Sequence, residues 1–250
     1  MEFVKVENIS KSFNNHKVLD NISFSSDNFD SLLIIGRSGV GKSVFLKTCV
    51  RLIEPDEGKI FINGIDVLSL NESELEEFRK DIGVLFQNGA LFDFMNVEEN
   101  ILFVLENVRG ISGQEALNKA KEVLEMVGLP DVLKKMPSEL SGGMRKRVAL
   151  ARTISTDPKI LFLDEPTTGL DPITSDYVVS SIVELRNLLK VPLVVITHDI
   201  EVMKKIRGKV ILIYKGKVVF DGSLEKMFSD GNEFTKQFLS GSSYGPISVI

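Results

Sequence analysis

The sequence predicts an α/β protein with a mostly parallel central sheet, and two patterns carry that prediction. Short, continuously apolar runs recur along the chain, with the length and composition of strands buried on both faces: SLLIIG, KILFLDE, PLVVITHD and KVILIYKGKVVF. Helical patterns separate several of these runs, as in VFLKTCVRLI after the first and PITSDYVVSSIVELRNLLK after the second. Such alternation is typical of a parallel sheet covered by helices.

Two other parts of the chain depart from this alternation. Residues 3–25 predict two strands joined by a polar turn, and residues 59–67 contain an Asn-Gly pair, a tight-turn signal between two β-rich halves. Residues 96–156 are helical in character, and Asn96 and Ser112 each begin a capping-box pattern. We therefore expect an antiparallel β-region near the N-terminus and a helical insertion in the middle of the chain.

Composition excludes several classes of protein. The 250 residues carry a formal net charge of -5, whereas nucleic-acid binding needs a basic face, so no nucleic-acid partner is expected. The single cysteine, Cys49, cannot form an internal disulfide, which fits a reducing compartment. The apolar runs are strand-sized, far below the roughly 20 residues that span a bilayer, and no signal peptide is expected. Membrane contact is expected only through a partner.

Residues 36–43, GRSGVGKS, match the pattern G-x-x-x-x-G-K-[ST] between an apolar strand and a helix. Glycines let successive backbone N–H groups surround a polyphosphate, and the N-terminus of the following helix adds its positive end. Lys42 is expected to reach the β- and γ-phosphates, and the Ser43 hydroxyl to bind Mg²⁺. A chance glycine-rich turn is the alternative, and the flanking strand and helix argue against it.

Polar side chains end two later apolar strands. Asp164 and Glu165 end ILFLDE, where Asp164 is expected to hold the Mg²⁺ hydration shell and Glu165 to orient or deprotonate a water. His198 ends VVITH. Because parallel strands deliver their C-terminal ends to one crevice, His198 is expected to be a positioning group at the γ-phosphate.

Residues 140–144, LSGGM, predict a second anion site. Ser141 is able to cap a helix whose first turn contains Gly142 and Gly143, and bare backbone N–H groups at a helix start attract anions. A single nucleotide site has no obvious need for two anion-binding segments, one at residues 36–43 and another at residues 140–144. The alternative is an ordinary capped helix whose basic residues, Arg145, Lys146 and Arg147, form a solvated face.

Together these motifs closely resemble those of the ATPases of ATP-binding cassette (ABC) transporters, over nearly the whole chain. GRSGVGKS resembles the Walker A motif, ILFLDE the Walker B motif, LSGGM the signature, and GLDP at 169–172 the D-loop. Gln87 resembles the Q-loop glutamine, and His198 the switch histidine. Phe13 resembles the aromatic residue that stacks on adenine, with an ordinary strand-end aromatic as the alternative. Met144 departs from the family pattern, in which glutamine is usual.

The resemblance implies the ABC ATPase fold, a P-loop NTPase with a RecA-like core, an N-terminal antiparallel β-subdomain and an inserted α-helical subdomain. The ATPase domain would span 1–240. Within it, 1–87 and 157–240 would form the core and β-subdomain, and 88–156 the helical subdomain. Residues 241–250 would be a C-terminal tail.

The resemblance also implies the site residues and the cofactors, ATP and Mg²⁺. The catalytic residues would be Glu165, His198 and Gln87. The metal-binding residues would be Ser43, Gln87 and Asp164. The nucleotide-binding residues would be Phe13, Gly36, Arg37, Ser38, Gly39, Val40, Gly41, Lys42, Ser43, Val44, Ser141, Gly142, Gly143 and Asp171.

In this family two copies pair head to tail, so that LSGGM of one subunit contacts the γ-phosphate held by GRSGVGKS of the other. Binding of ATP closes the dimer, and hydrolysis with product release reopens it. The implied partners are therefore a second copy of the chain and an integral-membrane permease.

A narrower resemblance joins QNGALFDFMNVEENI, MPSELSGGMRKR and FLSGSSYGPI to the Mla-type branch, whose members energise phospholipid transport between bacterial membranes. It implies a MlaE-like permease, an MCE-domain protein and a small STAS-type subunit as partners, at the cytoplasmic face of the inner membrane. An importer of polar solutes such as amino acids is the alternative. An ATPase acting on DNA or the ribosome is disfavoured, because 250 residues hold neither a second cassette nor a long coiled coil.

The apolar loop after Gln87, GALFDFMNVEEN, leads into the helical region that in the family receives a cytoplasmic helix of the permease. Leu91, Phe92, Phe94 and Met95 are therefore expected to form a docking surface. Packing of individual side chains inside the subunit is the alternative.

Overall fold

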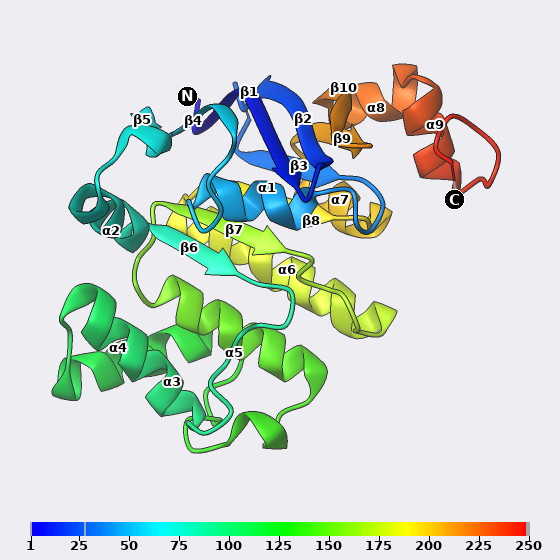
Figure 1. The fold of residues 1–250 in the computed structure, drawn as a ribbon. Helices are drawn as coiled ribbons and strands as arrows, with labels where there is room; N and C mark the ends of the chain where they lie inside the picture. Colours follow the sequence, from blue (N-terminus) through cyan, green and yellow to red (C-terminus); the bar gives the residue numbers. More distant parts are fainter. Residues whose placement is uncertain (1, 28, 249–250) are drawn as a thin grey trace. The chain divides into compact units, whose positions relative to one another are not determined.

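A computed structural model describes residues 2–27 and 29–248, which form two compact units (Figure 1). The first unit comprises Met1–Leu75 with Leu193–Ile250, and the second comprises Glu76–Pro192. Helix α2 (Glu72–Lys80) crosses the division. The predicted helical subdomain, 88–156, lies wholly within the second unit, and the predicted domain boundaries themselves stay a prediction.

An antiparallel sheet with the strand order β2-β1-β4-β5 begins the first unit. Its strands are β1 (Val4–Phe13), β2 (His16–Ser25), β4 (Glu57–Ile62) and β5 (Ile65–Asp66), and a short 3-10 turn, η1 (Val67–Ser69), follows. Asn14 and Asn15 join β1 to β2 with positive φ angles of 47° and 62°, as a tight hairpin turn requires. Both predicted hairpins are confirmed.

The parallel strands of the first unit form the centre of its hydrophobic core. β3 (Ser31–Ile35) pairs in parallel with β8 (Leu193–Thr197) and β9 (Lys209–Tyr214), and β10 (Lys217–Ser223) pairs antiparallel with β9. Every residue of β3 and β8 is buried, as expected for strands covered on both faces. The helices of this unit are α1 (Lys42–Cys49), α7 (Ile200–Ile206), α8 (Leu224–Asp230) and α9 (Glu233–Ser240).

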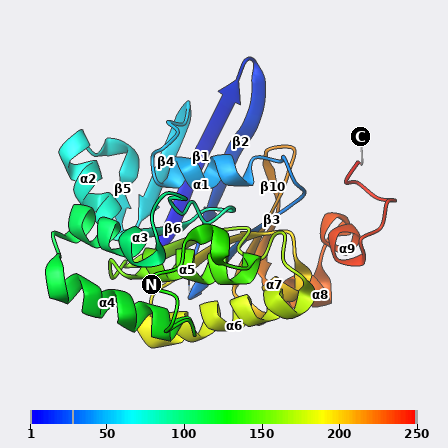
Figure 2. The same cartoon turned by 90° about the horizontal axis from the view of Figure 1, so that it is seen from below.

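The second unit combines two parallel strands, β6 (Ile82–Leu85) and β7 (Ile160–Asp164), with helices. The helical elements are α3 (Val97–Val104), a π-helical turn η2 (Leu105–Arg109), α4 (Gly113–Met126), a 3-10 turn η3 (Pro137–Glu139), α5 (Gly142–Ile154) and α6 (Pro172–Leu189). α5 packs against α3, α4 and α6 (Figure 2). The helical insertion is confirmed. Within the described residues, no helix has the length and apolar character needed to cross a bilayer.

Candidate functional site

The loop between β3 and α1 holds the first group of predicted site residues. Gly36, Gly39 and Gly41 have positive φ angles of 149°, 81° and 101°, which glycine adopts without strain. A Cβ at Gly36 would lie 2.5 Å from the carbonyl oxygen of Ile213, and one at Gly41 would lie 2.9 Å from that of Val18. The loop is therefore packed against β9 and β2 at its two ends, while the space beside Gly39 is open.

Lys42 begins α1 and places its ammonium group against this loop. The residue is 5% exposed, and its Nζ donates hydrogen bonds to the carbonyl oxygens of Gly36 at 2.7 Å and Arg37 at 3.0 Å. Ser43 and Val44 follow in the first helical turn and are half-buried. No acidic residue occupies that turn, so the positive helix end is available to an anion.

A pocket of about 520 Å³ opens beside the loop, a size that suits a small-molecule ligand. It is lined by His16, Lys17, Val18, Arg37, Ser38, Gly39, Val40, Tyr214, Lys215, Gly216 and Ser248. Sequence reasoning predicted the loop residues and missed the remainder. Phe13 is not among the lining residues; it ends β1, 42% exposed, with the Lys11 Nζ 5.4 Å from its ring centre.

His198 directly follows β8, and the strand register relates it to the phosphate loop. Ile35 pairs with Thr197, so Gly36 and His198 are the residues that follow this pair at the same end of the sheet. The Thr197 Oγ1 accepts a hydrogen bond from the backbone N–H of Asp199 at 3.0 Å, which defines the turn around the exposed His198.

In the second unit, β7 delivers two carboxylates at its C-terminal end. Asp164 and Glu165 are 5% and 7% exposed. Glu165 has a φ of 48°, a left-handed conformation that is uncommon outside glycine and typical of functional turns. The Thr168 hydroxyl donates to the Glu165 carboxylate at 3.4 Å. A buried acid held in an unusual backbone conformation fits a catalytic role better than a solvated surface role.

Lys146, on α5, is the most informative residue that sequence reasoning misinterpreted. It is 7% exposed, so the alternative of a solvated basic face from Arg145 to Arg147 is wrong at its central residue. Its Nζ donates to the backbone carbonyl of Gln87 and, at 3.5 Å, to that of Glu165. Burial lowers the pKa of Lys146, and the carboxylates of Asp164 and Glu165 oppose that shift.

Lys146 lies on a face of α5 that also carries other buried residues. Gly143, Lys146 and Leu150 are all buried, and their separations of three and seven residues place them on one helical face.

The predicted second anion site is the N-terminus of α5. Ser141 is exposed and caps the helix, since its Oγ accepts a hydrogen bond from the backbone N–H of Met144 at 3.3 Å. A Cβ at Gly143 would overlap the side chain of Thr174. Asp171 caps α6 by accepting hydrogen bonds from the N–H groups of Ile173 and Thr174. A Cβ at Gly142 would lie 3.2 Å from the Leu170 side chain, so the signature and D-loop segments lie against each other in this unit.

The apolar loop after Gln87 is held in shape by two polar side chains of the helices. The fully buried Asn100 donates from its Nδ2 to the carbonyl oxygens of Phe92, Met95 and Asn96, and its Oδ1 accepts from the N–H of Phe92. The Arg152 guanidinium donates to the carbonyl oxygens of Gly89 and Ala90 at 2.9 and 2.8 Å, and burial lowers its pKa.

The four apolar side chains of this loop differ in exposure. Phe94 is 75% exposed, whereas Leu91, Phe92 and Met95 are half-buried. The Phe92 ring contacts that of Phe103, with centroids 5.3 Å apart. Phe94 is therefore the side chain of this loop that is most available to a partner. Leu91, Phe92 and Met95 pack partly inside the subunit, as the alternative interpretation expected.

The residues present fit a nucleoside triphosphate with Mg²⁺. Three glycines and Lys42 form a cationic cradle for phosphate, and the open space beside Gly39 admits a ligand to its backbone. Mg²⁺ prefers oxygen ligands and keeps several waters, and each residue of the predicted set, Ser43, Gln87 and Asp164, carries a side-chain oxygen that is able to bind it.

Comparison with known proteins identifies the family. The sequence profile of the ABC transporter family matches residues 19–168. The chain is 34% identical over 246 residues to the probable ribonucleotide transport ATP-binding protein mkl of Mycobacterium leprae, covering 98% of this chain and 71% of that protein. It is 36% identical over 240 residues to the methionine import ATP-binding protein MetN of Clostridium acetobutylicum, covering 96% and 74%. These names support the family and do not single out the Mla-type branch.

Solved structures agree with the sequence comparisons. The chain resembles the ATP-binding cassette MJ0796, seen as a dimer in a post-hydrolysis state with ADP and Pi, with a TM-score of 0.80 and 32% identity over 88% of this chain and 98% of that one. It also resembles cbiO1 of Clostridium perfringens, with a TM-score of 0.82 and 26% identity over 95% of each chain. The predicted ABC ATPase fold is confirmed, with ATP and Mg²⁺ as its cofactors. The chain belongs to the ABC transporter family, as an ATP-binding subunit that hydrolyses ATP.

Proposed function

We propose that the chain binds Mg²⁺-ATP at the phosphate loop and uses its hydrolysis to drive movement in a membrane permease. Backbone N–H groups of Gly36–Ser43 and the Lys42 ammonium would hold the β- and γ-phosphates. Ser43, Gln87 and Asp164 would hold Mg²⁺, which when bound withdraws charge from the phosphate oxygens. The packing of the loop and the position of Lys42 against it carry this assignment.

Glu165 is proposed as the group that accepts a proton from the attacking water. Its carboxylate is buried and its orientation is supported by the Thr168 hydroxyl. His198 and Gln87 are proposed as positioning groups for the γ-phosphate and the water, because the Gln87 side chain is a neutral amide and His198 is exposed, whereas the Glu165 carboxylate is buried. Phe13 is retained as the proposed adenine contact, beside rather than within the pocket lining.

A second copy of the chain is proposed to complete each ATP site. Ser141, Gly142 and Gly143 would contact the γ-phosphate held by the other copy, and Asp171 would lie near that junction. The exposed, capped start of α5 supports this arrangement, because a helix N-terminus attracts anions. Converting an open pair to a closed pair, from 1:99 to 99:1, needs about 5.5 kcal/mol, or roughly 3 kcal/mol from each nucleotide.

Phospholipid is the cargo we propose, moved between bacterial membranes. The Mla-type segments of the sequence support it, among them the apolar loop with the exposed Phe94 and the signature with Met144. The partners would be a MlaE-like permease, an MCE-domain protein and a small STAS-type subunit, with the chain bound to the permease at the cytoplasmic face of the inner membrane.

A small polar solute is the second candidate cargo. The relatives named for methionine import and ribonucleotide transport favour it, since the chain matches them over nearly its whole length. Both candidates use the same ATP chemistry, so the nucleotide site does not distinguish them.

Purification of the tagged chain with its membrane partners from its own host separates the two candidates. We expect an MCE-domain protein and bound phospholipid, identified by mass spectrometry, and ATP turnover in lipid nanodiscs that responds to phospholipid supplied as cargo. A matched preparation from cells expressing the Phe94→Asp variant should recover less of the permease, because the exposed Phe94 is proposed to dock against it. Recovery of a solute-binding protein instead, with turnover stimulated by methionine or a ribonucleotide, would contradict the lipid proposal and leave the ATPase assignment intact.

A further inference from the structure

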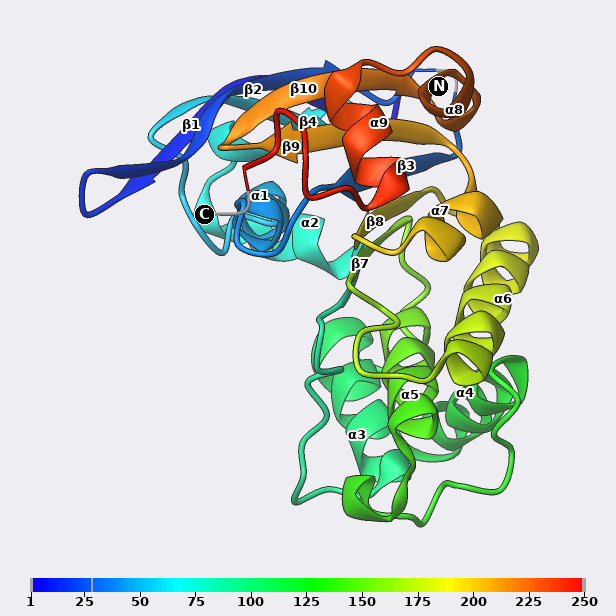
Figure 3. The ribbon, with the colours of Figure 1, turned by 90° about the vertical axis from the view of Figure 1, so that its right-hand side faces the viewer.

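Residues 241–248 turn back onto the first unit beside the phosphate loop (Figure 3). α9 ends at Ser240, and Gly241 takes a left-handed conformation with a φ of 63°. Ile247, seven residues past the helix end, is only 6% exposed. The segment Gly241–Ser248, here called the tail segment, is therefore anchored to the unit at Ile247, while most of its other residues are exposed.

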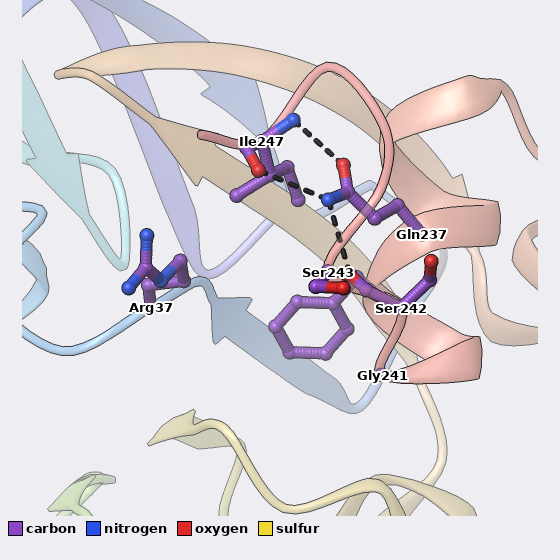
Figure 4. Close-up of a pocket in the computed structure, with 7 residues that line it drawn as sticks. Arg37, Gln237, Gly241, Ser242, Ser243 and Ile247 are labelled. Carbon is purple, nitrogen blue, oxygen red and sulfur yellow. Dashed lines mark hydrogen bonds between the residues drawn. The ribbon is translucent and has the colours of Figure 1, made fainter. Parts of the chain in front are cut away.

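Gln237 of α9 organises the tail segment (Figure 4). Its buried side-chain amide donates to the carbonyl oxygens of Ser242 at 3.1 Å and Ile247 at 2.9 Å, and accepts from the N–H of Ile247 at 2.6 Å. Gly245, with a φ of 146°, passes so close that a Cβ there would overlap the Gln237 side chain. One side chain thus satisfies the backbone of a loop that would otherwise bury unpaired polar groups.

Beyond this anchor, Ser248 reaches the nucleotide pocket. Its Oγ lies 2.9 Å from the Tyr214 hydroxyl oxygen, and its backbone N–H donates to the same oxygen at 3.0 Å. Its carbonyl oxygen accepts a hydrogen bond from the Arg37 guanidinium. Ser248 and Tyr214 both line the pocket beside the loop.

Arg37 is where the tail segment and the phosphate-binding lysine meet. Its guanidinium donates to the carbonyl of Ser248, while its own carbonyl accepts from the Lys42 Nζ at 3.0 Å. A continuous chain of contacts therefore runs from Tyr214 and Ser248 through Arg37 to Lys42. Restraining the second residue of the loop in this way lowers the ordering cost of binding a phosphate group.

We propose that the tail segment is a positioning element of the nucleotide site, which holds Arg37 and thereby sets the affinity for the triphosphate of Mg²⁺-ATP. Gln237 fixes the segment, and Tyr214 fixes its last described residue, Ser248. The proposal deepens the proposed function and rests on the assignment of residues 36–44 as the phosphate site.

Tyr214→Phe is the sharpest variant, because it removes the hydroxyl that contacts Ser248 and keeps the ring that packs on Phe234, with centroids 5.5 Å apart. Tyr244→Phe is the matched control, since Tyr244 is 89% exposed. Both are made in the full chain carrying Glu165→Gln, and the Kd for Mg²⁺-ATP is measured by calorimetry. Loss of one or two hydrogen bonds predicts a Kd raised about five- to tenfold for Tyr214→Phe and unchanged for the control.

Removal of residues 242–250 and the change Arg37→Gln complete the test. Each should raise the Kd by at least as much as Tyr214→Phe, and Tyr214→Phe combined with Arg37→Gln should add no further loss, because both act through one contact chain. A Kd for Tyr214→Phe within twofold of the control, or full additivity with Arg37→Gln, overturns the proposal. A lower unfolding temperature of these variants with an unchanged Kd for Mg²⁺-ATP would also overturn the proposal. Lys42→Ala reports separately on the phosphate-site assignment: wild-type affinity there would refute that assignment instead.

Discussion

The Lys146 ammonium donates a hydrogen bond to the backbone carbonyl of Gln87. The same group lies 3.5 Å from the carbonyl oxygen of Glu165, so one buried cation joins the backbones of two segments whose side chains are proposed to act on the attacking water. The cation stays inside the unit because Asp164 and Glu165 offset part of its burial cost. Lys146 is thus a candidate positioning residue for hydrolysis.

Lys146→Met should lower kcat about 10- to 100-fold with little change in the Kd for ATP, because the half-buried carbonyl of Gln87 and the buried carbonyl of Glu165 lose their donor, at a cost of about 1–3 kcal/mol. Steady-state turnover and equilibrium ATP binding are the measurements. Lys121→Met, at an exposed lysine of α4, is the control and should leave both unchanged. Unchanged kcat in Lys146→Met, with only a lower unfolding temperature, would show that the contact is structural.

Asn100→Asp should destabilise the second unit by about 3–5 kcal/mol at neutral pH, because a buried carboxylate would face three carbonyl oxygens that now receive hydrogen bonds. Thermal and urea unfolding measure the loss. Burial and the three carbonyl oxygens should raise the pKa of such a carboxyl by more than the Arg152 guanidinium, 3.4 Å from the Asn100 Oδ1, lowers it, so the destabilisation should shrink as the pH falls and the acid becomes protonated.

Asn118→Asp is the matched change for this experiment, on the exposed face of α4. It should shift the free energy of unfolding by less than about 0.5 kcal/mol. Equal effects of the two substitutions would mean that Asn100 does not hold the apolar loop.

Local sequence signals predicted the turns, helices and strands. The features that the sequence did not predict depend on contacts between residues far apart in the chain. The turn at Asn14 and the capping box at Asn96 formed as predicted, because each depends on a few neighbouring residues. The capping box predicted at Ser112 is wrong: the φ of 63° at Gly113 turns the helix start away, and the Ser112 side chain makes no capping hydrogen bond.

The buried role of Lys146 had no signal in its charged neighbours, because the segments that receive its hydrogen bonds come from elsewhere in the chain. The tail segment was missed for a similar reason. In the sequence Gln237 looks like an ordinary helical residue. Its role depends on hydrogen bonds to the backbone of Ile247, ten positions later, which no local pattern indicates. The phosphate loop was predictable because its chemistry is contained in eight consecutive residues.

Glu165→Gln should retain ATP binding and lower turnover by about 10²- to 10⁴-fold, the usual contribution of a general base. With ATP and Mg²⁺ it should accumulate as a dimer, measured by light scattering after size-exclusion chromatography. Adding Ser141→Arg should abolish that dimer, because a guanidinium would fill the capped start of α5 where γ-phosphate is proposed to bind. Unchanged hydrolysis by Glu165→Gln would contradict its assignment as the base.

Phe94→Asp should spare ATP binding and basal turnover while uncoupling hydrolysis from transport. The side chain is 75% exposed, so its replacement costs little folding stability, whereas docking against a permease helix would lose about 1.5–3 kcal/mol of apolar burial and would bury a charge. Leu52→Asp is the matched control, at a residue that is 55% exposed in the other unit. Transport and ATPase activity are compared in vesicles containing the complete transporter.

Phe94 is the better choice than Phe92, because the Phe92 ring also packs on Phe103 and beneath Arg152, so that its loss would disturb the loop itself. Full transport by Phe94→Asp would place the docking surface elsewhere. Loss of transport by both variants would instead indicate a general effect of added negative charge.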